Sequence, residues 1–248
     1  MTTTFFLRLV LAHMLGDYVF QPVRLVVMKR RGWTGLITHS IIHTVITGML
    51  LWGQTGLWWF WTLALGIIHL AIDQYRTFFA APDSRYGLYL FLADQVIHLA
   101  VIVATTALGV GWQSEQLLSL FNGQAALADR VMAYLIIFIA LVWTAPVLEF
   151  EAVRTLTFAY LNPQMRQDPR VDLADRFLGA VERLIATVLV LLRLWVLVPV
   201  AFIPRLVVQW DRWRRPETRL GALIRLLISF VLAVCLGGLL SLVPLKLY

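Results

Sequence analysis

The sequence predicts an all-α fold, a polytopic bundle of about eight transmembrane helices. Hydrophobic residues make up 60% of the 248-residue chain and charged residues 14%, whereas a soluble domain is about 45–50% apolar and about 25% charged. The mean hydropathy is +0.79. Apolar stretches of about 20 residues, long enough to cross a bilayer, recur along the chain. Such a chain has too little polar surface to cover a soluble globule.

Eight apolar stretches supply the predicted spans in order. They are residues 4–22, 34–52, 57–76, 86–110, 131–150, 173–192, 194–210 and 219–245. The run 173–210 is too long for one span, and we divide it at Arg193; a single span there, giving seven, is the alternative. We interpret the chain as one integral membrane domain. Its parts are a first half over 1–110, an extracytoplasmic connector over 111–130, and helices five to eight over 131–248.

Lysines and arginines predict the orientation of these spans. They are concentrated in four loops, 23–33, 77–85, 151–172 and 205–219. With eight spans these loops share one side, which is the cytoplasmic side by the positive-inside rule, and both termini lie outside. Seven spans would place the basic 205–219 loop outside, which is why we prefer eight. Topology thus explains the net charge of +7, and we expect no nucleic-acid partner.

All five histidines lie in the first four predicted helices, and each has a histidine or an aspartate four residues away. The pairs are His13 with Asp17, His39 with His43, His69 with Asp73, and Asp94 with His98. Residues four apart share one face of a helix. Ionisable side chains inside a membrane are costly and usually mark a functional interior. The pairing therefore predicts four site-bearing helix faces.

The depth of the pairs predicts that these faces meet. The pairs fall late, early, late and early in successive helices, and successive helices alternate in direction, so all four lie in the cytoplasmic leaflet. Five imidazoles and three carboxylates suit one or two ions of zinc, manganese or iron, as in di-metal four-helix bundles. Gln21, Gln74 and Gln95 are candidate outer donors. The alternative is hydrogen bonding between helices without a metal.

Several segments resemble the motifs of a bacterial inner-membrane family of unknown function. They are residues 11–21 (LAHMLGDYVFQ), 38–43 (THSIIH), 69–73 (HLAID), 94–98 (DQVIH) and 176–184 (RFLGAVERL). The resemblance implies a multi-pass protein of the bacterial inner membrane. The His-x-x-x-Asp and Thr-His-Ser elements resemble, more weakly, the membrane-bound metal-dependent hydrolases, and this likeness implies a hydrolase. The region 111–170 departs from that second pattern.

The leading functional hypothesis is a metal-dependent hydrolase of a lipid or lipid-linked substrate. All eight paired residues are the candidate ligands, and Asp17, Asp73 and Asp94 are the candidate catalytic carboxylates. The alternatives are a metal-ion or proton transporter, and a structural subunit of a larger membrane complex. We expect membrane lipids as partners, with further membrane subunits or a second copy of the chain as possible others. Beyond the site, Glu149 and Glu151 are candidate extra ligands or acidic helix ends, and Glu182 and Arg183 are expected in buried ion pairs that join helices.

Overall fold

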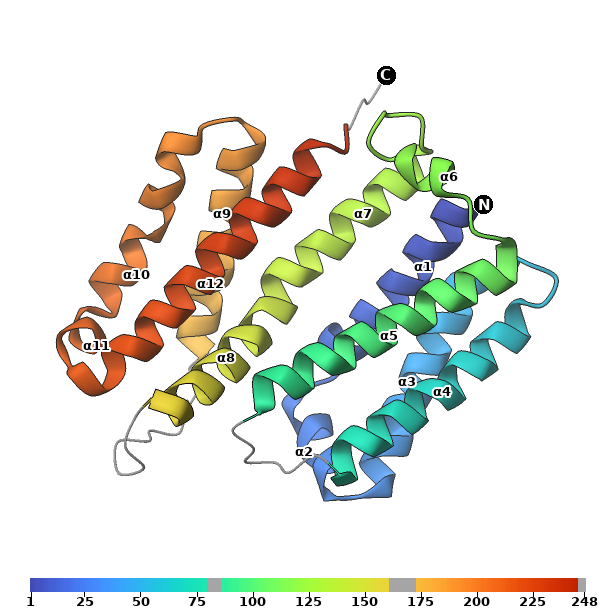
Figure 1. Ribbon diagram of the computed structural model, residues 1–248, viewed down its shortest axis with the longest axis horizontal. Helices are drawn as coiled ribbons and strands as arrows, with labels where there is room; N and C mark the ends of the chain where they lie inside the picture. The colour runs from blue at the N-terminus through green and yellow to red at the C-terminus, as the bar shows by residue number, and fades with distance from the viewer. Residues whose placement is uncertain (80–85, 161–172, 245–248) are drawn as a thin grey trace. The chain divides into compact units, whose positions relative to one another are not determined.

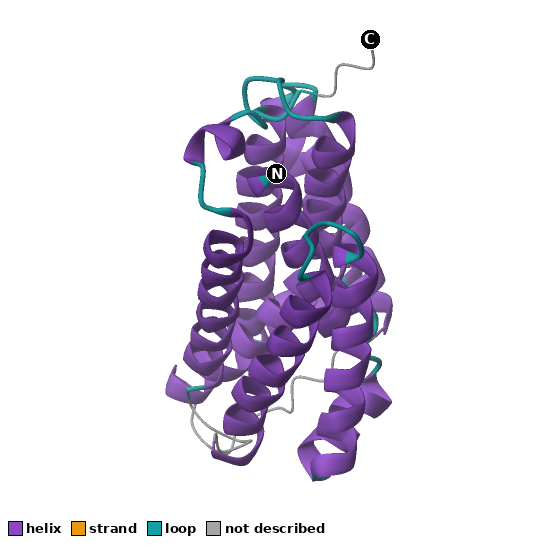
Figure 2. Ribbon diagram, turned by 90° about the vertical axis from the view of Figure 1, so that its right-hand side faces the viewer, coloured by secondary structure: helices purple, strands orange, loops and turns teal. Residues whose placement is uncertain are grey.

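The computed structural model describes residues 1–79, 86–160 and 173–244. Every regular element in these ranges is a helix, as Figures 1 and 2 show. The all-α prediction is therefore confirmed for the described part of the chain. The chain divides into two compact units. Unit 1 comprises Met1–Pro82, Leu92–Ile139 and Val243–Tyr248; unit 2 comprises Asp83–Phe91 and Ala140–Leu242.

The helices of unit 1 carry all the paired histidines and aspartates. In chain order they are α1 (Thr2–Met14), the π-helical turn η1 (Leu15–Val19), α2 (Val23–Arg31), α3 (Trp33–Leu51), α4 (Trp58–Phe79), α5 (Gly87–Val110, from Leu92 onward in this unit), α6 (Ser114–Leu118) and α7 (Leu127–Ile139). Helices α1, α3, α4 and α5 share one apolar core built from Phe5, Leu9, Leu51, Leu65 and Ile102. This core brings the four predicted site-bearing helices together.

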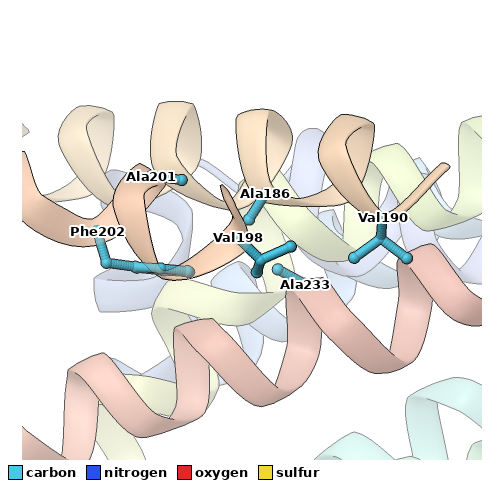
Figure 3. Packing of buried hydrophobic residues seen from close by; sticks show 6 residues of the cluster. All are labelled: Ala186, Val190, Val198, Ala201, Phe202 and Ala233. Atoms are coloured by element: carbon cyan, nitrogen blue, oxygen red, sulfur yellow. The ribbon is translucent and has the colours of Figure 1, made fainter. Parts of the chain in front are cut away.

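The helices of unit 2 pack through small side chains. They are η2 (Ala140–Thr144, a π-turn), α8 (Ala145–Tyr160), α9 (Leu173–Leu191), the 3-10 helix η4 (Trp195–Phe202), α10 (Ile203–Val208), α11 (Trp210–Arg214) and α12 (Pro216–Ser241). Figure 3 shows the core where α9, η4 and α12 meet, built from Ala186, Val190, Val198, Ala201, Phe202 and Ala233. Small residues allow close approach of helices where no water drives association.

Four helical stretches are long and apolar enough to cross a membrane. They are Trp33–Leu51, Gly87–Val110, Leu127–Thr157 and Pro216–Ser241, and they coincide with the predicted second, fourth, fifth and eighth spans. The other long helices fall short for physical reasons. The first helix contains Arg8, His13 and Asp17, α4 carries Asp73 and Arg76, and α9 carries four charged residues. A membrane helix bundle is thus supported, and the count of eight spans stays a prediction.

The break predicted at Arg193 is present, although the segment after it is not a regular α-helix. Arg193 has a φ of 61°, a left-handed conformation that cannot continue a helix, and it follows the end of α9. The chain then continues as η4, which contains Pro199, because proline lacks the amide proton that an α-helix needs. The apolar stretch Trp195–Val208 is consequently shorter than a full span.

Two predicted connections contain short helices. The basic loop 23–33 folds as α2, in which Leu25 is buried while Arg24, Arg30 and Arg31 are exposed. The connector 111–130 contains α6 and the first turn of α7. One buried leucine among charged residues was too weak a periodic signal to predict a helix in 23–33. The presence of α2 matters, because it brings a lysine to the site described next.

Candidate metal centre

All eight predicted ligand residues converge in unit 1. They form three overlapping groups, in each of which one possible ligand atom per residue lies within 4.8 Å of the others. The groups are His13, Asp17, His43 and His69; His39, His69 and Asp73; and Asp73, Asp94 and His98. Seven of the residues are buried, and the Asp17 side chain is 11% exposed. The four helix faces therefore come together in the structure, and the role of these residues as metal ligands stays a prediction.

Two imidazoles and two carboxylates form the tightest part of the cluster. His39 Nε2 lies 3.3 Å from Asp17 Oδ1 and 3.2 Å from Asp73 Oδ2. His69 Nε2 lies 3.5 and 3.4 Å from the same two oxygens, and the two Nε2 atoms are 3.0 Å apart. Ligand atoms around a tetrahedral ion with bonds of about 2.0–2.1 Å are about 3.3–3.4 Å apart. Within the group His39, His69 and Asp73 these separations match the spacing of ligands around one divalent ion, whereas Asp17 belongs to a second group with His13, His43 and His69.

Two of the three remaining histidines present a buried nitrogen that has no hydrogen-bond partner among the described residues, namely His43 Nε2 and His98 Nε2. His98 Nδ1 lies 2.9 Å from the Asp94 backbone carbonyl, an acceptor that fixes the proton on Nδ1 and leaves Nε2 with a lone pair. Metal-bound histidines in proteins use the same arrangement. A cavity of about 20 Å³, lined by His13, His43, His69 and His98 among others, adjoins these rings. It is large enough for one ion or one water molecule.

A π-turn and a glycine position the first pair. The helix widens over Leu15–Val19, which contains Asp17, and such π-turns occur frequently at functional sites. A Cβ atom on the buried Gly16 would lie only 2.6 Å from His43 Cδ2. Glycine at this position therefore allows the first helix to approach the His43 ring on α3 closely enough for both helices to contribute to the cluster.

Two of the three predicted outer donors contact the cluster. The side-chain amide nitrogen of Gln21 lies 3.3 Å from His39 Nδ1, and a metal on His39 Nε2 would require the amide to turn so that its oxygen accepts from Nδ1–H. Gln95 Nε2 donates to Asp94 Oδ2 at 2.9 Å, and its Oε1 accepts from the Tyr18 hydroxyl at 2.8 Å. Gln74 makes no hydrogen bond to these residues in the described structure. The glutamines thus orient one histidine and one aspartate, as outer residues of metal sites do.

Two cations that sequence reasoning did not assign to the site also contact it. The Lys29 ammonium pairs with Asp73 Oδ2, and Arg76 Nη1 lies 2.8 Å from Asp94 Oδ2. Both residues were interpreted only as topology determinants of basic loops. For Arg76 a signal was available, since it lies three residues after Asp73 on the same helix and hence near its face. For Lys29 there was none, because its position depends on how α2 packs.

Unit 2 contains separate buried ion pairs. Arg183 Nη1 donates to Glu149 Oε1 at 2.6 Å, Arg183 Nε donates to the Leu141 carbonyl in the π-turn η2 at 2.7 Å, and Arg205 Nε donates to Glu182 Oε2 at 2.7 Å. Glu182 and Arg183 join helices through buried ion pairs, as expected. Their partners are Arg205 and Glu149, which lie on two different helices. The charge of Glu149 is already balanced by Arg183, so it is no free ligand.

Comparison with known proteins places the chain in a family without assigning it an activity. No significant match was found among curated proteins or among solved structures. A family model described as "Protein of unknown function (DUF3307)" matches residues 5–128, which is half of the chain and contains all eight clustered residues. The chain therefore belongs to this family of unknown function, as the resemblance of its histidine and aspartate motifs implied.

Proposed function

We propose that this protein is a membrane-bound hydrolase that depends on a divalent metal ion and acts on a lipid or lipid-linked substrate. The observation that carries the proposal is the group of three ligand atoms from His39, His69 and Asp73, which lie 3.0–3.4 Å from one another. Mixed imidazole and carboxylate ligands suit zinc, manganese or iron. The unpartnered Nε2 atoms of His43 and His98 are available as ligands for a second ion.

The residues have separate roles in this proposal. A metal ion bound there lowers the pKa of its water toward neutrality and polarises a phosphoryl or acyl oxygen. His39, His69 and Asp73 hold the ion at the buried end of the cluster. Asp17 is the most exposed of the carboxylates, with 11% of its side chain accessible against 1% for Asp73 and 4% for Asp94. It is therefore the best placed to accept a proton from water.

The proposal includes the topology inferred from the sequence. Eight spans with both termini outside place the cluster in the cytoplasmic leaflet of a bacterial inner membrane, within reach of lipid headgroups. An ion or proton pathway is the main alternative. Against it, the apolar core of Phe5, Leu9, Leu51, Leu65 and Ile102 occupies the same four helices beside the cluster, whereas a pathway needs polar groups along its length. A subunit role would instead predict stoichiometric partners after purification in mild detergent.

Metal analysis of the purified protein tests the proposal. We expect about one or two equivalents of a transition metal in the wild type and the loss of about one equivalent in Asp73→Asn, because a ligand carboxylate becomes a neutral amide. Asp129→Asn is the matched control: Asp129 is also a buried aspartate of unit 1, but its Oδ2 accepts from Thr4 at 3.0 Å outside the cluster. Less than about 0.2 equivalents in the wild type after reconstitution would overturn the proposal.

A further inference from the structure

Two of the three carboxylates of the cluster, Asp73 and Asp94, are paired with cations whose side chains are more exposed than their own. The Lys29 side chain is 12% exposed while its partner Asp73 is 1% exposed. The Arg76 side chain is 34% exposed while its partner Asp94 is 4% exposed. Each cation therefore bridges a buried metal-ligand residue and the accessible side of the site. A substrate that approaches from that side meets these two cations first.

Formal charges indicate what such a site attracts. Without a metal, three carboxylates and two cations sum to −1. One divalent ion changes the sum to +1, and two ions change it to +3. Lys29 contacts Asp73 Oδ2, the same oxygen that faces His39 and His69. An ion bound to that oxygen repels the ammonium, which then needs a new anionic partner because an uncompensated charge in this setting is costly.

We propose that Lys29 and Arg76 are the substrate-binding residues of this site and that they recognise a phosphate ester. This inference rests on the proposed metal-dependent function and assigns its substrate class. A carboxylic ester or amide is neutral and would offer no anionic partner to a Lys29 ammonium that a metal has displaced from Asp73. A phosphate carries the charge that the metal-loaded site lacks. A guanidinium matches two phosphate oxygens at once, and a lysine ammonium binds phosphate as a point charge.

The helix that carries Lys29 has the features of a membrane-surface helix. Helix α2 buries Leu25 and exposes Arg24, Arg30 and Arg31 alongside Val27 and Met28. Basic amphipathic helices lie in the headgroup region and are attracted to anionic lipids. A phosphate ester that reaches Lys29 can thus be a lipid headgroup, although a soluble phosphate ester offers the same chemistry to the two cations.

The chemical step follows from these assignments. The oxygen of a water molecule forms a bond to phosphorus while the bond from phosphorus to the ester oxygen breaks. One proton of the water passes to a carboxylate of the site, for which Asp17 is the candidate, and the carboxyl group so formed gives that proton to the ester oxygen, which leaves as an alcohol. Lys29 and Arg76 hold the nonbridging phosphate oxygens, where negative charge is concentrated. The products are inorganic phosphate and an alcohol.

Binding of inorganic phosphate to the full-length protein, purified in detergent and loaded with Mn²⁺, tests the inference by calorimetry. We expect Lys29→Gln and Arg76→Gln each to weaken phosphate binding about tenfold or more, the usual effect of losing a hydrogen bond to a charged group. Metal content should not fall in Lys29→Gln, since the variant removes a competitor for Asp73. Arg30→Gln, which removes the same charge from an exposed position of α2, should bind phosphate as the wild type does.

Further measurements distinguish a lipid from a soluble phosphate ester and show which of the two proposals fails. Competition by phosphatidic acid in nanodiscs but not by glycerol 3-phosphate identifies a lipid substrate, and competition by both includes soluble esters. Competition by neither overturns the inference. Wild-type phosphate affinity in both glutamine variants, with metal present, overturns the inference and leaves the metal site intact. Absence of metal from the wild type overturns the proposed function itself. Lys29→Arg should restore binding; if it does not while the variant stays folded, the lysine is only structural.

Discussion

Replacing Gly16 by alanine should damage the metal centre from a position that offers no ligand atom. The added Cβ would lie 2.6 Å from His43 Cδ2 and 3.2 Å from His43 Cγ. Ordinary contact between carbon atoms begins near 3.5 Å, so the ring or the first helix must move by about 0.9 Å. Metal–ligand distances tolerate only about 0.2 Å. We therefore expect weaker metal binding as well as lower stability.

The loss of unfolding free energy expected for Gly16→Ala has two opposing contributions in the metal-free protein. Overpacking a well-packed interior costs about 1–3 kcal/mol, and replacing glycine by alanine in a helix offsets about 1 kcal/mol of that. The net loss is then about 0–2 kcal/mol for the metal-free protein. Loss of bound metal adds to it in the loaded protein, about 2.7 kcal/mol where the free ion is at 100 times its dissociation constant. The loaded protein should therefore lose more stability than the metal-free protein.

Thermal unfolding of the purified variant, with and without added metal, measures both quantities. Gly238→Ala is the control, since Gly238 also lies in a helix but a Cβ there meets no atom within 4 Å. We expect the control to unfold at or above the wild-type temperature and to keep its metal. If Gly16→Ala keeps both the wild-type metal content and the wild-type unfolding temperature, the close approach of the two helices does not hold the site together.

Two further predictions concern the metal and the ion pairs of unit 2. A chelator should lower the unfolding temperature of the wild type but not that of His39→Ala, because only a protein that holds the ion has metal-linked stability to lose. The control Trp58→Phe should respond to the chelator as the wild type does. Equal responses in all three proteins would count against a bound metal. Arg183→Met should cost about 3–5 kcal/mol because it leaves the Glu149 carboxylate buried and unpaired. Adding Glu149→Gln should recover part of that loss in a double-mutant cycle, and strict additivity of the two losses would mean that the pair is not coupled.

The local pattern of the sequence was enough to predict the helices and the histidines and aspartates that cluster. Spacing of four residues places His69 and Asp73 on one face, and this holds in any helix whatever surrounds it. Because successive helices alternate in direction, the four residue pairs were then predicted to lie at one depth in the membrane. Both rules are independent of packing, and the eight residues that they selected are the eight that the structure gathers in three overlapping groups. The break at Arg193 was likewise visible, because a charged residue in a long apolar run marks its interruption.

Tertiary structure decided what the local pattern left open. The separations of 3.0–3.5 Å around His39 and His69 depend on how the first helix, α3 and α4 cross, and the packing of their apolar faces determines that crossing. Lys29 reaches Asp73 only because α2 buries Leu25 against the bundle, and Glu182 and Arg183, adjacent in sequence, find partners on different helices. Residue spacing determines which side chains share a helix face, whereas the partners across helices follow from packing between segments far apart in the chain.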